Sequence, residues 1–326
     1  MKSKLLKTLQ YVFFLFTALI LLYFAFRNID INEVIQQIRH ADYRWVATSV
    51  VFGALALVFR ALRWRLLIEP LNKKPSRINI FHAINIGYLA NFVFPRIGEV
   101  TRCGILNRTD RIPADKLFGT VIVERLFDIL TTIFMLFIIL LMRFNLVMEN
   151  ILLPAVSGMS NLINILLTIV IIALIIFAIN KFLGKRLLKI KIMQKINDMF
   201  NGVAEGIKSI KSLRKPKLFI ILTFFLFGMY YMQTYTMFFA LESAASLGLG
   251  DALFILVLSS LAFIIPAPGG FGAYHLIVAI GMTKLGVTDV DGQAYATLAH
   301  SSTSILLIMM GMLSLIIVFS KKNNIE

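Results

Sequence analysis

Residues 78–107 read INIFHAINIGYLANFVFPRIGEVTRCGILN, and residues 251–286 read DALFILVLSSLAFIIPAPGGFGAYHLIVAIGMTKLG. Both stretches are apolar enough to enter a membrane, but Pro95 to Gly98 interrupts the first and Pro266 to Gly270 interrupts the second. Non-helical backbone is tolerated at membrane depth only where it is buried in protein or lines a polar cavity. We therefore predict two re-entrant helical hairpins, each with its break inside the membrane.

The composition of the whole chain indicates a membrane protein. Of its 326 residues, 59% are hydrophobic and 15% are charged, whereas soluble domains average about 45–50% and about 25%. This balance, with a mean hydropathy of +0.83, excludes an ordinary soluble globule. Cys103 is the single cysteine, so an internal disulfide is excluded, and no cysteine and histidine spacing resembles a metal site. We expect no metal and no cofactor.

Six other apolar stretches approach the length of about 20 residues that a membrane-spanning helix needs. They cover residues 8–26, 45–64, 127–142, 162–180, 218–240 and 295–319. Between the first two, Ile31, Val34, Ile35 and Ile38 recur at helical spacing, which predicts a short amphipathic helix on the membrane surface. The predicted fold class is thus an all-α polytopic membrane protein with about six full transmembrane helices and two re-entrant hairpins, in a single domain.

The distribution of positive charge predicts the topology. Residues 181–217 hold eleven Lys and Arg against two acidic residues, so this loop carries 11 − 2 = +9 of the net charge of +16. Loops rich in Lys and Arg stay in the cytoplasm, so we place this loop and both termini there. The loop is expected to lie on the anionic cytoplasmic leaflet as an amphipathic helix, which leaves no role for nucleic acid. With these segments in the cytoplasm, the number of predicted spans between them requires the two hairpins to enter the membrane from opposite sides.

The first hairpin carries the strongest candidate site. Its break combines polar side chains with residues that interrupt a helix, namely Asn91, Pro95, Arg96, Gly98, Glu99 and Arg102. If Pro95 begins a helix, Arg96, Glu99 and Arg102 share one face and Glu99 can orient both guanidiniums. The planar guanidinium suits a lipid phosphate. The alternative is that both arginines extend to the cytoplasmic headgroups, with Glu99 as a salt-bridge partner.

A second cluster comprises Glu124, Arg125 and Asp128, at the start of the third predicted span. Glu124 and Asp128 are four residues apart and so share a helix face, where two close carboxylates repel unless an arginine lies between them. A role in proton coupling is one interpretation. A structural ion pair that braces this helix against Arg60 or Arg63 is the other.

The break of the second hairpin is rich in proline and glycine: Pro266, Pro268, Gly269, Gly270 and Gly272. Glycines allow close backbone approach, and free amides at the start of the next helix favour an anionic group. A nucleotide-binding loop is excluded because the Gly-Lys-Ser/Thr ending is missing. A plain helix break packed against its neighbours is the alternative. His275 is a candidate gate that titrates near neutral pH or a structural donor, and we interpret His300, in the last span, as structural.

These motifs resemble those of the lysylphosphatidylglycerol synthase transmembrane-region family, the flippase-like domain family also known as uncharacterised protein family 0104. The matching features are Arg60-x-x-Arg63-Trp64, Gly87-x-x-x-Asn91-x-x-x-Pro95-Arg96-x-Gly98-Glu99-x-x-Arg102, Glu124-Arg125-x-x-Asp128 and Pro266-x-Pro268-Gly269-Gly270-x-Gly272. They follow the family's order over nearly the whole chain. The family commonly has a Glu shortly after the glycine-rich stretch, where this chain has His275, so the resemblance does not extend to that acid.

The resemblance implies a multi-pass protein of the bacterial inner membrane that moves an aminoacylated phospholipid or a polyprenyl-linked lipid between leaflets. We expect Arg60, Arg63, Arg96 and Arg102 to bind the lipid phosphate, and no ATP-binding motif is present to drive transport. The sequence lacks the soluble catalytic domain of the synthases, so we do not expect an enzyme. The alternatives are a membrane subunit for a separate enzyme that modifies lipid headgroups, and a scaffold for envelope enzymes. A homo-oligomer is compatible with each.

Overall fold

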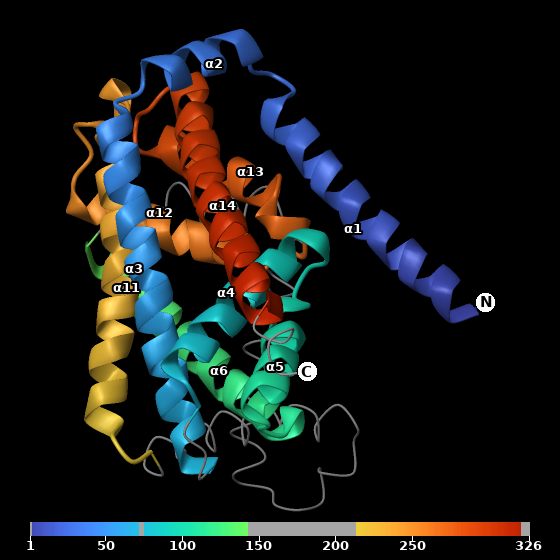
Figure 1. Ribbon diagram of the computed structural model, residues 1–326. Helices are drawn as coiled ribbons and strands as arrows, with labels where there is room; N and C mark the ends of the chain where they lie inside the picture. The colour runs from blue at the N-terminus through green and yellow to red at the C-terminus, as the bar shows by residue number, and fades with distance from the viewer. Residues whose placement is uncertain (1, 72–74, 143–212, 321–326) are drawn as a thin grey trace, which may run out of the picture. The chain divides into compact units, whose positions relative to one another are not determined.

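The computed structural model describes residues 2–71, 75–142 and 213–320, and all regular elements in these ranges are helices (Figure 1). The chain divides into one unit of Met1–Leu136 with Leu213–Glu326, and a second unit of Phe137–Ser212. The predicted span 162–180 and most of the predicted loop 181–217 lie outside the described residues.

Four described helices are long and apolar enough to cross a membrane. They are α3 (Tyr43–Ile68, continued by the 3-10 turn η1, Glu69–Leu71), α6 (Ala114–Met142), α11 (Pro216–Phe238) and α14 (Asp289–Ser320). A fifth candidate is α1 (Lys2–Phe26), which passes the same test together with the helix that follows it after an 85° bend. The chain is therefore an all-α polytopic membrane protein.

The helix after this bend is α2 (Ile31–His40), the short amphipathic helix expected between the first two spans. The Asp30 side chain begins it by accepting a hydrogen bond from the Asn32 backbone amide at 2.8 Å. Val34 is the buried residue of its apolar side. At the end of the molecule that carries α2, the Asp42 amide donates to the Ala240 carbonyl at 2.9 Å, and α3 pairs antiparallel with α11 from there.

Two pairs of shorter helices form the broken hairpins. The first consists of α4 (Arg77–Val93) and α5 (Gly98–Asp110). The second consists of α12 (Leu249–Ala262), the 3-10 turn η5 (Pro268–Gly270) and α13 (Ala273–Lys284). Helix α14 packs against both α4 and α13, so it links the two hairpins (Figure 1).

Helix α6 begins at Ala114, well before the expected start at residue 127. The reason is that Leu117 and Val121, four residues apart, form a buried stripe that carries the helix through this stretch. As a result Glu124 and Asp128 lie inside the helix rather than at the beginning of a span, at the level where α3 and α5 can reach them.

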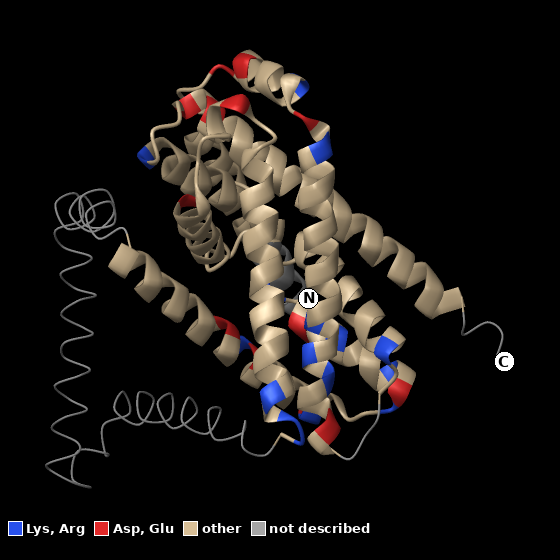
Figure 2. Cartoon of the chain, turned by 90° about the vertical axis from the view of Figure 1, so that its left-hand side faces the viewer, with Lys and Arg blue, Asp and Glu red and all other residues tan. Residues whose placement is uncertain are grey.

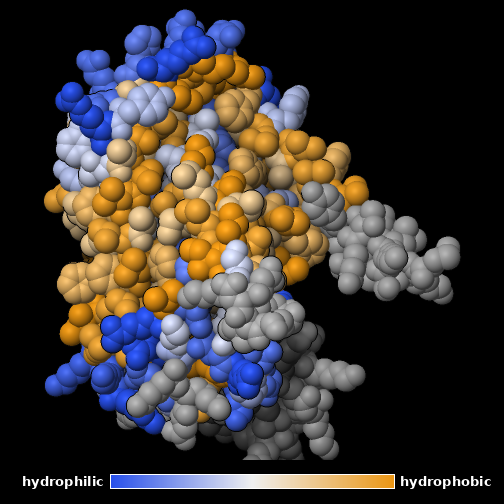
Figure 3. Space-filling view, in the orientation of Figure 1, coloured by the Kyte–Doolittle hydropathy of each residue, from blue (hydrophilic) through white to orange (hydrophobic). Residues whose placement is uncertain are grey.

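The surface is divided into an apolar band and two hydrophilic ends (Figure 3). The band contains highly exposed large side chains such as Phe13, Phe224 and Ile305. Lys and Arg gather at the end where α3 terminates, while the α2 end is richer in acidic residues (Figure 2). Arg65 lies in the last turn of α3 and Glu33 in the first turn of α2, while Asp289 and Asp291 lie in the first turn of α14, which contacts α2.

Candidate functional site

The break of the first hairpin is a tight turn over residues 94–97. The Ile97 amide donates to the Phe94 carbonyl at 3.3 Å. Pro95 stands at the second position and Arg96 at the third, with a φ of +63°, which is the arrangement of a type II turn. Glycine or asparagine normally takes that third position. An arginine with left-handed backbone is therefore strained, and such outliers cluster at functional sites.

Close backbone contact between α4 and α5 determines the shape of this hairpin. A Cβ atom at Gly98 would collide with the Gly87 carbonyl oxygen, and one at Gly87 would lie 2.8 Å from the Gly98 carbonyl oxygen. The Asn91 side chain accepts a hydrogen bond from the Gly98 amide at 2.7 Å and so satisfies a free donor at the start of α5. Gly87, Asn91 and Gly98 thus build the turn that presents Arg96.

Glycines in left-handed conformations form the break of the second hairpin. Gly269 has a φ of +59° and Gly272 a φ of +79°. A Cβ atom at Gly272 would lie 2.7 Å from the Ala18 carbonyl oxygen of α1, so the loop approaches that helix closely. This packing supports the simpler interpretation of the glycine-rich stretch as a break packed against its neighbours.

The two breaks contact each other. The Arg96 guanidinium donates through Nη2 to the Ile264 carbonyl oxygen at 2.9 Å. The rings of Phe92 and Phe271 lie 6.3 Å apart, and a Cβ atom at Gly269 would lie 2.5 Å from the Phe92 ring. The two hairpins therefore meet tip to tip, through one polar and one aromatic contact.

Arg96 is exposed, and its surroundings are apolar. Val93 is 63% exposed and Ile264 is 61% exposed. None of the ion pairs found among the described residues includes Arg96. A cation among lipid-facing side chains is costly unless an anion or water reaches it.

A buried group of charges, which we call the charge cluster, joins three helices below the turn. It comprises Arg60 and Arg63 of α3, Arg102 of α5, and Glu124 and Asp128 of α6. Glu124 is fully buried, and its Oε1 lies 2.9 Å from Arg60 Nη1 and 3.2 Å from Arg63 Nη2. Asp128 pairs with the same two arginines. These are the ion pairs that the bracing interpretation requires.

Arg102 is one of two arginines in the charge cluster with spare donors; the other is Arg63, whose Nε and Nη1 atoms make no hydrogen bond with the described residues. Arg102 Nη1 lies 2.8 Å from Glu124 Oε2, and its guanidinium stacks 4.5 Å from the centre of the Trp64 ring. Trp64 is itself held by a hydrogen bond to Thr120 Oγ1 at 2.9 Å. The Nε and Nη2 atoms of Arg102 make no hydrogen bond with the described residues. A buried guanidinium with two unpaired donors is suited to bind an anion by donating hydrogen bonds to it.

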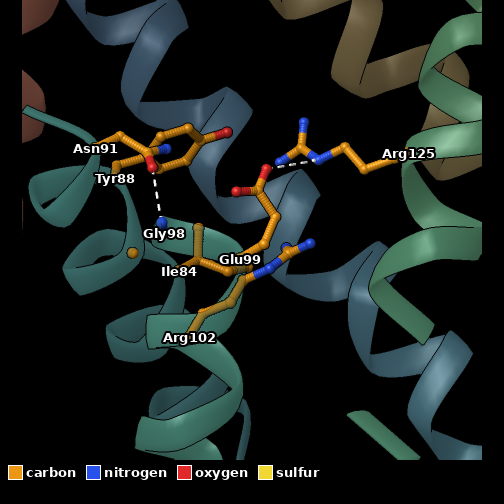
Figure 4. A pocket seen from close by; sticks show the side chains of 8 residues that line it. Ile84, Tyr88, Asn91, Gly98, Glu99, Arg102 and Arg125 are labelled. Atoms are coloured by element: carbon orange, nitrogen blue, oxygen red, sulfur yellow. Dashed lines mark hydrogen bonds and ion pairs between the residues drawn. The ribbon is translucent and has the colours of Figure 1, made fainter. Parts of the chain in front are cut away.

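A small pocket lies between the turn and the charge cluster (Figure 4). Its lining includes Tyr88, Asn91, Glu99, Arg102 and Arg125. Glu99 points across it to Arg125, 3.3 Å away. The cavity volume is about 10 Å³, about the room that one water molecule needs. A phosphate group therefore enters only if the Glu99 and Arg125 side chains separate.

The geometry differs from the expected helix of Arg96, Glu99 and Arg102. Pro95 does not begin α5, because Arg96, directly after it, has left-handed backbone that a right-handed helix cannot contain. The helix begins at Gly98. Arg96 consequently points to the second hairpin, Arg102 to Glu124, and Glu99 to Arg125. Glu99 does not orient both arginines.

His275 lies opposite His300 of α14, with ring centres 4.9 Å apart. His300 Nε2 is 2.9 Å from the Gly269 carbonyl oxygen. Since a carbonyl can only accept, this nitrogen carries the proton. The two imidazoles thus lie against the glycine-rich loop, where both rings also contact Phe271. Among the described residues, no group of three or more His, Cys, Asp or Glu could hold a metal ion.

Several partners of the site were not found by sequence reasoning. Trp64 is indicated by the family motif alone. Its position next to Arg63, on a helix that ends in arginines, is the pattern in the sequence that points to its role. Tyr230, whose hydroxyl accepts from Arg60 Nε at 3.3 Å, carries no local signal. Ile264 contributes a backbone carbonyl, which sequence patterns cannot indicate.

Comparison with known proteins agrees with this architecture. The family model for the lysylphosphatidylglycerol synthase TM region matches residues 9–311, which include α3 to α6, α11 to α13 and most of α14. The chain belongs to this family. No solved structure matches it.

Two curated relatives align over most of their length. A UPF0104 membrane protein of Methanocaldococcus jannaschii is 25% identical over 98% of this chain and 97% of the relative. A UPF0104 membrane protein of Pyrococcus horikoshii is 23% identical over 84% of this chain and 88% of the relative. A shorter match, 33% identical over 32% of this chain and 17% of the other protein, is to the glycosyltransferase AglD of Haloferax volcanii.

Proposed function

We propose that this family member moves an anionic or aminoacylated phospholipid, or a polyprenyl-linked lipid, between the leaflets of the membrane. The observation that carries the proposal is Arg96, an exposed cation with strained backbone at the contact of two broken hairpins, surrounded by exposed apolar side chains. A lipid phosphate that reaches Arg96 gains a charge-assisted hydrogen bond while its acyl chains remain in the hydrocarbon. Such a contact lowers the cost of bringing a headgroup to membrane depth.

The charges along α5 suggest the route of the headgroup. Arg96 stands at the hairpin tip, the Glu99 and Arg125 pair follows, and Arg102 is buried beyond it. The Glu99 and Arg125 side chains are 23% and 40% exposed, and ion pairs at this exposure contribute about 0–1 kcal/mol. A phosphate can therefore replace Glu99 on Arg125 at little cost and then reach the free donors of Arg102.

The remaining members of the charge cluster serve a different purpose in this proposal. Arg60 and Arg63 are buried and each pairs with both Glu124 and Asp128, so we assign them to positioning α3, α5 and α6 rather than to the first contact with phosphate. Removing one partner of a buried ion pair is strongly destabilising. These remaining members then act as a rigid support for Arg102.

We further propose that the end rich in Lys and Arg faces the cytoplasm, as the positive-inside rule implies. In this orientation the hairpin of α4 and α5 opens to the cytoplasm, and that of α12 and α13 opens to the outside. The basic segment 181–217 would contact the anionic leaflet, and a gradient of ions or of the lipid itself would drive transport.

Reconstitution into proteoliposomes tests the proposal. The probe is fluorescent phosphatidylglycerol, with fluorescent phosphatidylcholine and a polyprenyl phosphate for comparison. We expect wild type to translocate one headgroup class and Arg96→Ala to lose at least about tenfold, the equivalent of one charged hydrogen bond. The matched control is Arg108→Ala, an exposed arginine near the end of α5. Equal rates in wild type and Arg96→Ala would disprove the assigned role.

A second candidate function is that of a membrane subunit for a separate enzyme that modifies lipid headgroups. The local similarity to a protein named as a glycosyltransferase favours it. This function predicts a chemically altered lipid when the chain is present together with its partner, whereas a flippase leaves the lipid unchanged. Mass spectrometry of lipids from cells with and without the chain separates the two.

A further inference from the structure

A row of buried polar atoms without partners runs along one face of α14. Gln293, Thr297 and His300 are spaced at i, i+4 and i+7, so their side chains lie on one face. Gln293 is 0% exposed and His300 is 3% exposed. Both amide atoms of Gln293, the Thr297 hydroxyl and Nδ1 of His300 make no hydrogen bond with the described residues.

The row ends at the pair of imidazoles against the glycine-rich loop. His275 is 4% exposed, and its Nδ1 likewise lacks a hydrogen bond with the described residues. His300 is anchored to the loop through Gly269. Because His300 Nε2 is the donor in that bond, its Nδ1 in the neutral ring is a free acceptor.

Other polar side chains near this part of α14 are paired. Gln233 of α11 donates to Thr303 Oγ1 at 3.0 Å, and Ser302 donates to the Ala299 carbonyl at 3.1 Å. The unpaired atoms of Gln293, Thr297 and His300 are therefore grouped on one face of this part of α14, while Asn85 of α4 is a separate buried side chain without a hydrogen bond to the described residues. Buried polar groups in proteins are nearly always hydrogen bonded, and where protein groups are absent ordered water takes their place.

The outer end of the row lies next to open space. A hollow of about 460 Å³ lies between α2 and the start of α14, lined by Glu33, Gln36, Gln37, Thr288, Val290 and Asp291. Val290 is one helical turn before Gln293 on the same face. Water in this polar hollow is thus within one turn of the first unpaired amide.

We propose that a file of water molecules leads from this hollow past Gln293 and Thr297 to His275 and His300. The path gives aqueous protons access to the two imidazoles, which are the proton acceptors at its end. Within the described ranges, the other titratable side chain in ring contact with them is Tyr274 of α13, 5.0 Å from the His300 ring, while Phe26 and Phe271 supply apolar walls. The path goes beyond the proposed transport function, since it requires no lipid.

Silver ion accessibility tests the path, because Ag⁺ reacts with thiols and enters channels that are as narrow as a water file. Cys103 is the single cysteine, so Cys103→Ser provides a background without thiols. In this background, Gln293→Cys and Thr297→Cys place a thiol on the path. Ala296→Cys places one at a buried position on another face, and Ile305→Cys places one on the lipid-exposed surface. Proteoliposomes are treated with silver nitrate, and the remaining thiols are counted with a fluorescent maleimide after denaturation.

We expect Gln293→Cys and Thr297→Cys to react with Ag⁺ at least tenfold faster than Ala296→Cys and Ile305→Cys. Adding Gln293→Leu to Thr297→Cys is expected to slow the reaction at residue 297, because the leucine fills the path upstream. Equal rates at residues 296 and 297 would overturn the proposal. Variants are accepted only if they elute as a single species in detergent. The readout does not depend on lipid movement, so its failure is distinct from failure of the proposed transport.

Discussion

Arg96 of the first hairpin and Ile264 of the second are joined by a hydrogen bond of 2.9 Å from the guanidinium to the backbone carbonyl. The bond connects two chain segments that are far apart in sequence, at the point where each interrupts its helix. It occupies one donor of Arg96 without neutralising the charge. The contact therefore positions the arginine and leaves it able to bind an anion.

The strain at Arg96 gives a test that separates backbone from side chain. Left-handed backbone costs a non-glycine residue roughly 1–2 kcal/mol, and Arg96 has a φ of +63°. We expect Arg96→Gly to be more stable than Arg96→Ala by about 1 kcal/mol in thermal unfolding in detergent. Both variants are expected to lose lipid translocation equally. Translocation retained by the glycine variant alone would indicate that the turn, not the guanidinium, matters.

The close contact of α4 and α5 predicts a severe effect at Gly98. Gly98→Ala places a methyl group against the Gly87 carbonyl oxygen, so the helices must separate. We expect loss of the folded hairpin, measured as a large drop in thermal stability. Gly104 of the same helix has open space around its Cβ position, so the control Gly104→Ala is expected to stabilise α5 by about 0.5–1 kcal/mol. A neutral Gly98→Ala would show that the two helices do not touch there.

The charge cluster predicts that neutralising Glu124 of α6 destabilises the protein more than neutralising Glu99 of α5. Glu124 pairs with three arginines and is fully buried, so Glu124→Gln leaves unbalanced charge inside the protein. We expect a loss of about 3–5 kcal/mol in the free energy of unfolding. Glu99→Gln, which breaks a partly exposed pair, is expected to cost about 0–1 kcal/mol. Chemical denaturation of the two variants in the same detergent measures the difference, and equal losses would contradict the assigned burial.

Contact of the hairpin tips predicts coupling between Phe92 and Gly269. A Cβ atom at residue 269 lies 2.5 Å from the Phe92 ring, and Gly269 also has left-handed backbone. We expect Gly269→Ala to destabilise the protein, and Phe92→Ala to reduce but not remove that effect, since the backbone strain remains. A double-mutant cycle of thermal stabilities measures the coupling. Strict additivity would mean that the two tips are not in contact.

Apolar length and the position of proline and glycine were sufficient to predict the helical membrane fold, because backbone in lipid must form its hydrogen bonds within the helix. The same rule identified the breaks at Pro95 and Pro266. The start of α6 was missed because its first turns are amphipathic, and packing of Leu117 and Val121 continues the helix where hydropathy alone ends it.

The sequence by itself determined the fold class, the family and the residues that carry charge into the membrane. The partners of those charges were decided by the tertiary structure alone. Glu124 forms ion pairs with three arginines of two other helices. Arg96 donates a hydrogen bond to a carbonyl in a segment more than 160 residues away. Spacing along a chain indicates which side chains share a helix face. The contacts between the faces of different helices depend on how those helices cross. The crossing is determined by packing between segments that are distant in the sequence.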